Sequence, residues 1–353
     1  MLIVDMQHCA NWRDKMTYEE MLKKASTNSA IFDMIVKAHS ILCNPKYEKI
    51  LVSVSGGADS DIMVDLCENL VPKKVHYVWF DTGIEYQATK DHLNYLENKY
   101  GIEIVRQKPD VPVPLGNKKY GQPFLSKLVS EHIQRLQHND FKWEDKPYDE
   151  LITEYPNCKS SIIWWTNHHE VTEGFRSSMF NINYHRYLKE YMIENPPTFK
   201  ISQNCCFGAK KNVSHKYLKC FKGDLILTGV RKSESGIRSA TYKSCFTEKS
   251  KKYKIAQYRP LFWLTDYDRE QYEHIFKIKH SRCYTEYGFS RTGCAGCPFG
   301  KQYEDELVKI KRYEPKLYVA ITNIFNNSYE YTRGYLKFRR EHIKLERGQR
   351  SLF

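Results

Sequence analysis

The sequence predicts a doubly wound α/β fold with a mostly parallel sheet, a helical insertion and a helical C-terminal region. Short β-branched runs at 49–54, 74–80 and 102–105 alternate with segments of helical pattern, clearest at 87–100. Strands that alternate with helices at this spacing form βαβ units and a parallel sheet. The first two runs each end in a polar turn that contains glycine, and a strand pattern returns at 222–229.

Helical patterns flank this α/β region. Thr17 and Glu20 have the spacing of a capping box, and apolar residues recur at helical spacing between 31 and 38. From about 110 to 200 the alternation breaks, and Trp164 and Trp165 there could stack nucleic-acid bases or fill a core. Helices are expected at 304–310 and 317–325. We therefore predict an N-terminal helical segment (1–47), a nucleotide-binding domain (48–110 and 200–275), a helical insertion (111–199) and a C-terminal region with cysteines (276–353).

Composition limits the partners and the location. The chain has 353 residues and a formal net charge of +13, which favours a nucleic acid or a multiply charged nucleotide, although lysines on a solvated surface give the same balance. No apolar run approaches the roughly 18 residues that a membrane helix needs. The N-terminus lacks a basic region leading into an apolar segment, so it does not resemble a signal peptide. We expect a cytoplasmic protein without a membrane partner.

Residues 55–60, Ser-Gly-Gly-Ala-Asp-Ser, are suited to bind a phosphate. They lie between a buried strand and an amphipathic segment. Glycines let the backbone approach a phosphate closely, and the start of the next helix offers unpaired N–H groups to an anion. Ser55 and Ser60 can add hydrogen bonds, and Asp59 could hold Mg²⁺ or cap the helix. A purely structural Gly-Gly turn is the alternative.

This loop and two further motifs resemble one superfamily. The loop is similar to the S-G-G-x-D-S loop of PP-loop ATP pyrophosphatases, and no G-K-[ST] follows it as in a Walker loop. Residues 80–89 resemble the D-T-G element of phosphoadenosine-phosphosulfate (PAPS) reductases, and 228–238 resemble their G-x-R-x-x-E-S-x-x-R signature. Many reductases carry lysine where this chain has Ala58. The resemblance implies the adenine-nucleotide α-hydrolase-like fold, with the nucleotide at the carboxyl ends of the strands.

The motifs name candidate residues. If the chain is helical from Ser233, then Arg231, Glu234 and Arg238 share one face, and the two guanidiniums could clamp phosphate or sulfate oxygens. An exposed helix with an internal Glu–Arg pair is the alternative. The candidate catalytic residues are Asp59, Arg231, Glu234 and Arg238. The residues expected to bind the nucleotide are Ser53, Ser55, Gly56, Gly57, Asp59, Ser60, Asp81, Thr82, Gly83 and Gly229.

Several of the eleven cysteines form close pairs. In a long chain without a signal peptide, such pairs favour metal or cluster ligation over disulfides. Cys205-Cys206 with the C-x-x-C-P run at 294–298 resembles the ligand set of iron–sulfur adenosine-phosphosulfate (APS) reductases. Four thiolates suit a [4Fe-4S] cluster or, alternatively, zinc. We expect Cys294 and Cys297 as ligands, then Cys206, with Cys205 or Cys245 as the fourth, since DNA-phosphorothioation relatives also place a cysteine near the position of Cys245.

The resemblance implies an enzyme that binds ATP or a sulfonucleotide (APS or PAPS) with Mg²⁺ and acts in sulfur transfer, as a transferase or oxidoreductase. A nucleic acid would be a suitable acceptor, and a cysteine desulfurase or thioredoxin a suitable partner. One alternative is a sulfate-assimilation reductase, which normally attacks with a cysteine in a C-terminal tail, whereas the last cysteine here is Cys297. Another is a non-catalytic nucleotide sensor or nucleic-acid-binding module, against which Asp59 and Glu234 argue.

Overall fold

The computed structural model describes residues 15–173, 178–234, 241–250, 254–300 and 302–350, without the side chains of 348–350. The chain divides into two compact units. Unit 1 takes its described residues from Met1–Phe80, Tyr86–Gln107 and Ser214–Gly293. Unit 2 takes them from Asp81–Glu85, Lys108–Val213 and Cys294–Phe353.

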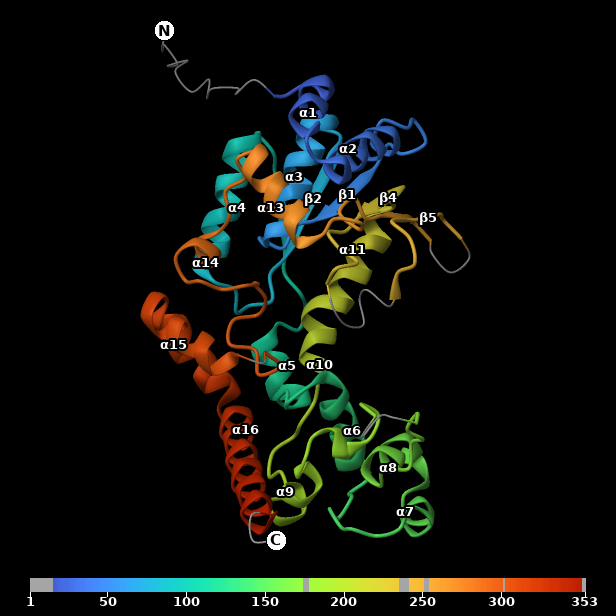
Figure 1. The fold of residues 1–353 in the computed structure, drawn as a ribbon, viewed down its shortest axis with the longest axis vertical. Coiled ribbons are helices and arrows are strands. Elements are labelled where there is room, and N and C mark those ends of the chain that lie inside the picture. Colours follow the sequence, from blue (N-terminus) through green and yellow to red (C-terminus); the bar gives the residue numbers. More distant parts are fainter. Residues whose placement is uncertain (1–14, 174–177, 235–240, 251–253, 301, 351–353) are drawn as a thin grey trace. The chain divides into compact units, whose positions relative to one another are not determined.

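Unit 1 contains the sheet (Figure 1). Its six described strands run in the order β3-β2-β1-β4-β6-β5, and every neighbouring pair is parallel except β5 with β6. The mostly parallel sheet predicted from the sequence is therefore confirmed. The strands are β1 (Ile50–Ser53), β2 (Val75–Phe80), β3 (Ile104–Gln107), β4 (Leu225–Leu227), β5 (Phe246–Thr247) and β6 (Ala256–Tyr258).

Helices cover both faces of this sheet. Successive side chains of a strand point to opposite faces. On β2, the Tyr77 hydroxyl donates to Glu68 of α3 at 2.8 Å, whereas the neighbouring His76 ring stacks on Phe221 of α11 with centroids 4.9 Å apart. Helices α3 and α11 therefore lie on opposite faces, as the doubly wound prediction requires. The described helices of unit 1 are α1 (Tyr18–Ala25), α2 (Ser29–Leu42), α3 (Ala58–Leu70), α4 (Gln87–Tyr100), α11 (Val213–Phe221, beginning one residue earlier, in unit 2), α13 (Asp266–Ile275) and α14 (Arg282–Thr285).

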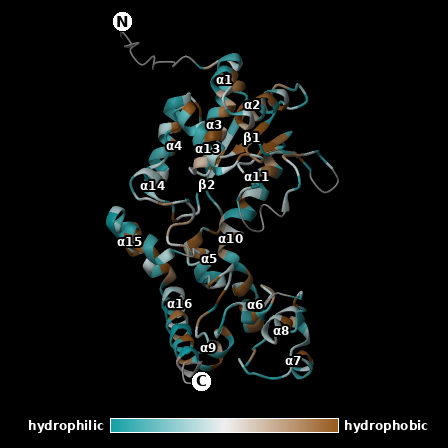
Figure 2. Cartoon of the chain, in the orientation of Figure 1, coloured by the Kyte–Doolittle hydropathy of each residue, from teal (hydrophilic) through white to brown (hydrophobic). Residues whose placement is uncertain are grey.

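The centre of unit 1 is apolar because the middle strand is covered on both sides. Ile50, Leu51 and Val52 of β1 are fully buried, and Figure 2 shows this strand as hydrophobic. A parallel strand buried on both faces has a continuous apolar run rather than an alternating one. The N-terminal helices add to the same core through Met21 and Ile31, and the predicted capping box at Thr17 is present.

Unit 2 is helical. The described helices are α5 (Val113–Tyr120), α6 (Lys127–His138), α7 (Tyr148–Glu154), α8 (Lys159–Trp165), α9 (Leu188–Glu194), α10 (Asn204–Cys206), α15 (Tyr303–Tyr313) and α16 (Pro315–Arg350), with a π-helical turn at Phe207–Asn212 and 3-10 turns at Pro156–Cys158 and Ile182–Tyr184. Trp164 and Trp165 are fully buried in a core that also contains Tyr335 of α16. These tryptophans therefore fill a core, and the base-stacking interpretation of them is wrong.

The units divide the chain differently from the four parts expected. The N-terminal helices join the sheet, and the insertion joins the C-terminal helices. An amphipathic helix has to bury its apolar stripe against another element. Two short helices cannot do so alone, so α1 and α2 pack on the helices of unit 1, and α16 packs on the insertion.

Candidate functional site

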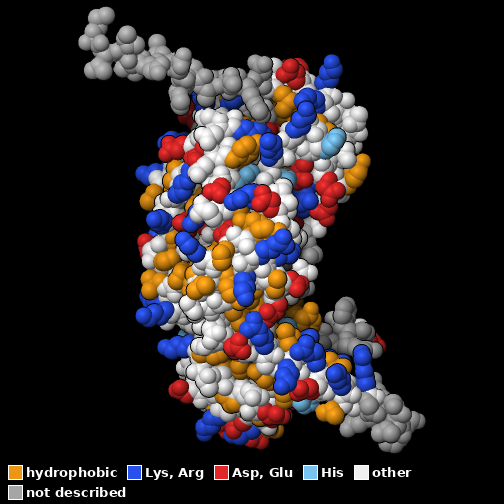
Figure 3. Space-filling view, turned by 90° about the vertical axis from the view of Figure 1, so that its left-hand side faces the viewer, with side chains coloured by type: hydrophobic (Ala, Val, Ile, Leu, Met, Phe, Trp, Pro, Cys, Tyr) orange, Lys and Arg blue, Asp and Glu red, His pale blue; other side chains and the backbone are white. Residues whose placement is uncertain are grey.

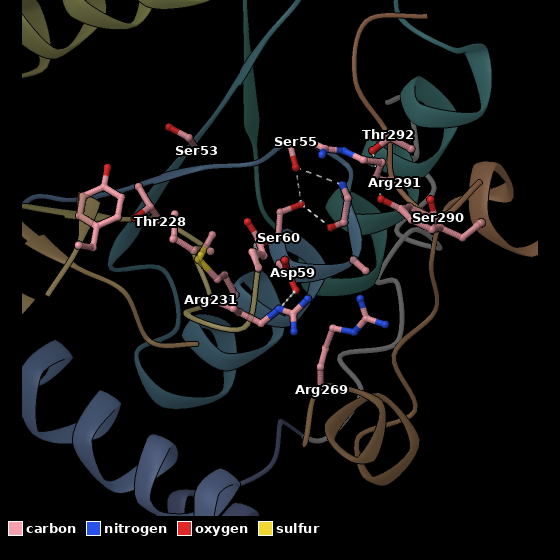
Figure 4. A pocket seen from close by; sticks show the side chains of 18 residues that line it. Ser53, Ser55, Asp59, Ser60, Thr228, Arg231, Arg269, Ser290, Arg291 and Thr292 are labelled. Atoms are coloured by element: carbon pink, nitrogen blue, oxygen red, sulfur yellow. Dashed lines mark hydrogen bonds and ion pairs between the residues drawn. The ribbon is translucent and has the colours of Figure 1, made fainter. Parts of the chain in front are cut away.

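A cavity of about 1020 Å³ lies in unit 1 where β1 and β4 end. From β1 the sheet continues to β2 and β3 on one side and to β4 and β6 on the other, so β1 and β4 flank its switch point. Ligands of open α/β sheets bind outside the carboxyl ends of the strands at such a point. Ser53 and Ser55 from β1 and the turn after it, and Thr228 and Gly229 after β4, line the cavity (Figure 4).

The loop between β1 and α3 has the conformation that its glycines allow. Gly56 has a φ of +70°, and a Cβ there would lie 2.7 Å from the Thr89 side chain. Gly57 is the N-cap of α3, and its N–H donates to Ser55 Oγ at 3.3 Å. The Ser60 hydroxyl donates to the Gly57 carbonyl at 2.7 Å. The loop thus holds its own shape and presents the first turn of α3 to the cavity.

Asp59 and Arg231, two candidate catalytic residues, are brought together beside this loop. Arg231 Nε lies 3.1 Å from Asp59 Oδ1, and Arg231 Nη1 lies 2.6 Å from Asp266 Oδ1. Burial raises the pKa of Asp59 to about 6, and the nearby Glu234 carboxylate also raises it, whereas Arg231 lowers it. Arg231 is 5% exposed. Its guanidinium lies between the carboxylates of Asp59 and Asp266.

The third motif is only partly described. Glu234 lines the cavity, and its N–H donates to the Arg231 carbonyl at 3.3 Å in a turn. Arg238 lies outside the described residues, so the shared helical face stays a prediction. Gly229 is tightly placed, because a Cβ there would lie 3.2 Å from Asp59 Cβ.

Asp81, Thr82 and Gly83 belong to unit 2 and do not line the cavity of unit 1. Thr82 is buried, and its hydroxyl donates to Glu85 at 2.6 Å. Gly83 has a φ of +88°, and its N–H donates to Asp81 at 2.9 Å. Their part in nucleotide binding stays a prediction.

Two arginines of the cavity lie outside the three motifs and were not predicted from the sequence. Arg269 lies on α13 and Arg291 in the loop after α14, and both line the cavity, as Figure 4 shows. The Thr265–Asp268 capping box was a local signal for the start of α13, but no local pattern indicates which side chain of α13 faces the loop. The other cavity residues that were not among the candidates are Ala58, Met63, Thr228, Val230, Tyr242, Tyr284, Ser290 and Thr292.

Four of the five candidate cysteines lie in unit 2. Cys205 and Cys206 form most of α10, and a Cβ on Gly116 of α5 would lie 3.1 Å from Cys205 Cα. This close approach seats the tandem pair on α5. Gly296, between the other two cysteines, has a φ of +60°, and its carbonyl accepts a hydrogen bond from Tyr329 of α16. Helices from both ends of unit 2 thus position the two pairs.

The thiols of the two pairs affect one another. A hydrogen bond from Cys205 lowers the pKa of Cys206 to about 6, and the positive charges of Lys127, Lys210 and Lys211 lower it further, against the effect of burial. The same hydrogen bond raises the pKa of Cys205, as does burial, and the charges of Cys206, Cys297 and Cys294 raise it further.

The second pair shows the same coupling. Burial raises the pKa of Cys297 to about 12, and the charges of Cys294 and Cys206 also raise it. Burial likewise raises the pKa of Cys294, which Lys210 lowers. The four thiols thus affect one another's pKa values, and nearby lysines affect them too.

The fifth candidate, Cys245, lies in unit 1. It is buried, and its carbonyl accepts the Arg259 N–H at 2.7 Å. Cys283, also in unit 1, lies with its sulfur 3.7 Å from Thr89 Oγ1, and Cys220 is exposed. In the described part of the chain, no three His, Cys, Asp or Glu side chains converge as ligands of a single metal ion.

No helix within the described ranges is both long enough and apolar enough to cross a membrane.

Comparison with known proteins gives a family. The family model described as the phosphoadenosine phosphosulfate reductase domain matches residues 49–156 and 125–299. An uncharacterized protein of Methanocaldococcus jannaschii is 25% identical over 153 residues, which are 41% of this chain and 28% of that relative. The chain therefore matches less than a third of that relative's length.

Three solved structures align with most of this chain, at TM-scores from 0.36 to 0.40. The PAPS reductase of Candida auris in its phosphate complex has 11% identity and a TM-score of 0.39, over 78% of this chain and 95% of that one. The FMN adenylyltransferase of Candida glabrata, with FMN and an ATP analogue, has 11% identity and a TM-score of 0.40 over 79% and 72%. The U34-tRNA thiolase of Methanococcus maripaludis, with its [4Fe-4S] cluster, has 13% identity and a TM-score of 0.36 over 92% and 80%.

Proposed function

The chain belongs to the phosphoadenosine phosphosulfate reductase domain family, and on that premise we propose that it is an enzyme that binds ATP or a sulfonucleotide in unit 1 and acts in sulfur transfer with an iron–sulfur cluster in unit 2. One observation carries the proposal. The Ser-Gly-Gly-Ala-Asp-Ser loop, two carboxylates and three arginines line one cavity at the switch point of the sheet.

The cavity suits a nucleotide in size and charge. Sites for small molecules have volumes of roughly 300–1,000 Å³, so about 1020 Å³ leaves room for an acceptor group beside ATP. The first turn of α3 offers N–H groups to a phosphate. Asp59 and Glu234 would hold Mg²⁺ together with phosphate oxygens, because Mg²⁺ takes one or two carboxylates beside substrate phosphates. The bound ion would neutralise phosphate charge.

The reaction we propose is adenylation. An acceptor oxygen forms a bond to the α-phosphorus of ATP, the bond from that phosphorus to the bridging oxygen breaks, and pyrophosphate leaves with the bond electrons. The arginines of the cavity stabilise the charge that develops on the phosphate oxygens. Such electrostatic stabilisation is usually the largest single contribution to the rate enhancement by an enzyme. A sulfur nucleophile can then attack the acceptor atom that bears this oxygen: a bond to sulfur forms, the bond from that atom to the oxygen breaks, and AMP leaves with the oxygen and the bond electrons.

Cys205, Cys206, Cys294 and Cys297 would hold the cluster. All four lie in unit 2, their thiols are electrostatically coupled, and lysines lie beside them to offset the negative charge of thiolates. Four cysteines are the usual ligands of a [4Fe-4S] cluster, whose corners are spread more widely than the ligands of one zinc ion. Such a cluster supplies an iron that can bind or pass on sulfur.

A nucleic-acid acceptor is supported by charge alone. The net charge of +13 favours a polyanion. On the face shown in Figure 3, however, lysine and arginine side chains are scattered among acidic ones rather than gathered in one patch. The acceptor therefore has to be identified by assay.

The first test is nucleotide binding, measured as the rise in melting temperature with ATP, AMP, APS or PAPS. A ligand that binds the folded state stabilises it by mass action. Asp59→Ala and Gly57→Val should abolish the rise, since a side chain at Gly57 would press on Ser55 and Tyr284, each 3.1 Å from the added Cβ. Arg282→Ala, a change of an exposed arginine in the same unit, should keep it. No rise with any of these nucleotides at millimolar concentration would contradict the proposal.

The second test identifies the reaction. Protein with its cluster intact should release pyrophosphate from ATP, faster when DNA or RNA is added, and should release no sulfite from APS or PAPS with thioredoxin. Sulfite release that is lost on Cys245→Ser or Cys283→Ser would instead establish a sulfonucleotide reductase that uses one of these thiols.

A further inference from the structure

A row of charged side chains leads from the cavity into the interior of unit 1. Arg269, which lines the cavity, has its Nε 3.2 Å from Glu273 Oε1, one turn further along α13. The same Glu273 oxygen lies 3.2 Å from His280 Nε2. His280 Nδ1 lies 2.7 Å from Asp61 Oδ2 on α3, and Asp61 Oδ1 lies 2.9 Å from His92 Nε2 on α4.

The inner end of this row is buried. Asp61 is 1% exposed and His92 5% exposed, and three elements meet at the Asp61 carboxylate. Both ring nitrogens of His280 face carboxylates, Nδ1 toward Asp61 and Nε2 toward Glu273. The contact with Asp61 is a hydrogen bond, and the contact with Glu273 is at ion-pair distance without hydrogen-bond direction.

At the outer end of the row, the Arg269 guanidinium lines the cavity. Arg231 is enclosed by Asp59 and Asp266. Arg269 Nε lies at ion-pair distance from Glu273, and, among the residues that the structure describes, a terminal nitrogen of Arg269 lies 3.8 Å from Glu270. An arginine guanidinium presents several N–H donors in a rigid planar fork that matches the geometry of a phosphate. Figure 4 shows the Arg269 guanidinium extending from α13 toward the loop.

We infer that Arg269 contacts the polyphosphate of the bound nucleotide and that Glu273, His280 and Asp61 are positioning residues that orient its guanidinium. This inference rests on the proposed function, because it needs a nucleotide in the cavity. It assigns phosphate binding to a residue outside the three motifs. Asp61 also belongs to the first turn of α3, so one carboxylate links the phosphate-binding loop to the arginine that faces it.

Affinity for ligands with different numbers of phosphates tests the inference. Isothermal titration with ATP and with adenosine would be compared in wild-type protein, Arg269→Ala, Glu273→Gln and His280→Gln. Arg269→Ala should weaken ATP by about tenfold to a hundredfold, because a hydrogen bond to a charged group is lost, and should leave adenosine unchanged. Glu273→Gln and His280→Gln should weaken ATP several-fold. Arg282→Ala, a half-exposed arginine of the same unit, is the matched control.

A double-mutant cycle separates positioning from general structural support. In the Arg269→Ala background, Glu273→Gln should have no further effect on ATP, because the residue it orients is gone. Equal weakening of ATP and adenosine, or full effects that simply add, would overturn the inference. Wild-type-like ATP binding by Arg269→Ala would overturn it and leave the proposed function standing. Failure of the wild-type protein to bind ATP would overturn both.

Discussion

The two units build their sites in different ways. In unit 1 the phosphate-binding loop is a single run of six residues whose hydroxyls and glycines fix its own shape. In unit 2 the two cysteine pairs come from distant parts of the chain, and each is seated by a helix far from it in sequence, the first by α5 and the second by α16. A site made of one loop depends on local geometry, whereas a site made of distant pairs depends on the packing of the whole unit.

The two sites also differ in the charged groups that line them. Unit 1 sets arginines against carboxylates around a cavity, an arrangement that suits phosphate with a divalent cation. Unit 2 sets lysines beside thiols, and they help to lower the pKa of Cys206, whereas burial raises the pKa of Cys294 and Cys297. The contrast predicts that each site can be removed without the other.

The largest expected effect is complete loss of the cluster. Cys297→Ser should remove iron, acid-labile sulfide and visible absorbance from anaerobically purified protein, because a missing thiolate exposes one iron to solvent. Cys158→Ser, a change of a buried cysteine of unit 2 outside the two pairs, is the control and should retain iron. The affinity of unit 1 for ATP should stay unchanged in both. Loss of ATP binding together with iron would break the contrast between the units.

The next effect concerns the core of unit 2. Trp164 is fully buried and stacks on His132 with centroids 5.1 Å apart. Trp164→Ala should lower the free energy of unfolding of unit 2 by about 3–5 kcal/mol, as large aromatic deletions in cores do. Trp263→Ala in unit 1, where the ring is 57% exposed, should cost less than about 1 kcal/mol. Urea unfolding measures both, and ATP binding that survives Trp164→Ala would show that unit 1 does not depend on this core.

A smaller effect is a pH dependence of the stability of unit 1. Burial would lower the pKa of His280, but Asp61 and Glu273 raise it from 6.5 to about 9. The stabilisation is therefore fully present below about pH 6.5 and is lost as the pH rises through about 9. The groups that face His280 are Asp61, Glu273, Tyr284 and, through these carboxylates, Arg269 and His92.

His280→Gln should remove this pH dependence. The loss of unfolding free energy should reach at most about 3 kcal/mol at pH 6, because one pH unit is worth about 1.4 kcal/mol, and should shrink toward pH 10. Denaturant titrations of wild-type and variant protein at several pH values measure it. A difference that is constant from pH 6 to 10 would mean that the His280 charge contributes nothing.

The smallest effect lies at the first helix. Thr17→Ala removes the side chain that accepts the Glu20 N–H at 3.2 Å and should cost about 1 kcal/mol of stability in unit 1. Thr17→Ser keeps an oxygen at that position and should cost less. A shift in the urea midpoint that is as large for serine as for alanine would argue against capping as the cause.

The sequence by itself determined the loop and four strands of the sheet, β1 to β4, but not β5 and β6. The strand at 49–54 and the helix at 87–100 follow from periodicity and flanking turns, and the structure has them as β1 and α4. Gly56 adopts a positive φ beside Thr89, a conformation that glycine permits and that the loop motif implied. These features are encoded within a few residues of chain, where backbone sterics and hydrogen bonds decide them.

Only the tertiary structure decided which charges meet and which helices share a core. Arg231 was expected to clamp phosphate, which stays a prediction, and its ion pairs with Asp59 and Asp266 are contacts that no local pattern indicates. Arg269 stood in no motif, because its place in the cavity depends on how α13 packs against α3. Trp164 and Trp165 form a core with Tyr335 of α16, an association that a local pattern cannot show. Ion pairs and cores join residues far apart in the chain, and their energy depends on burial that only the folded unit provides.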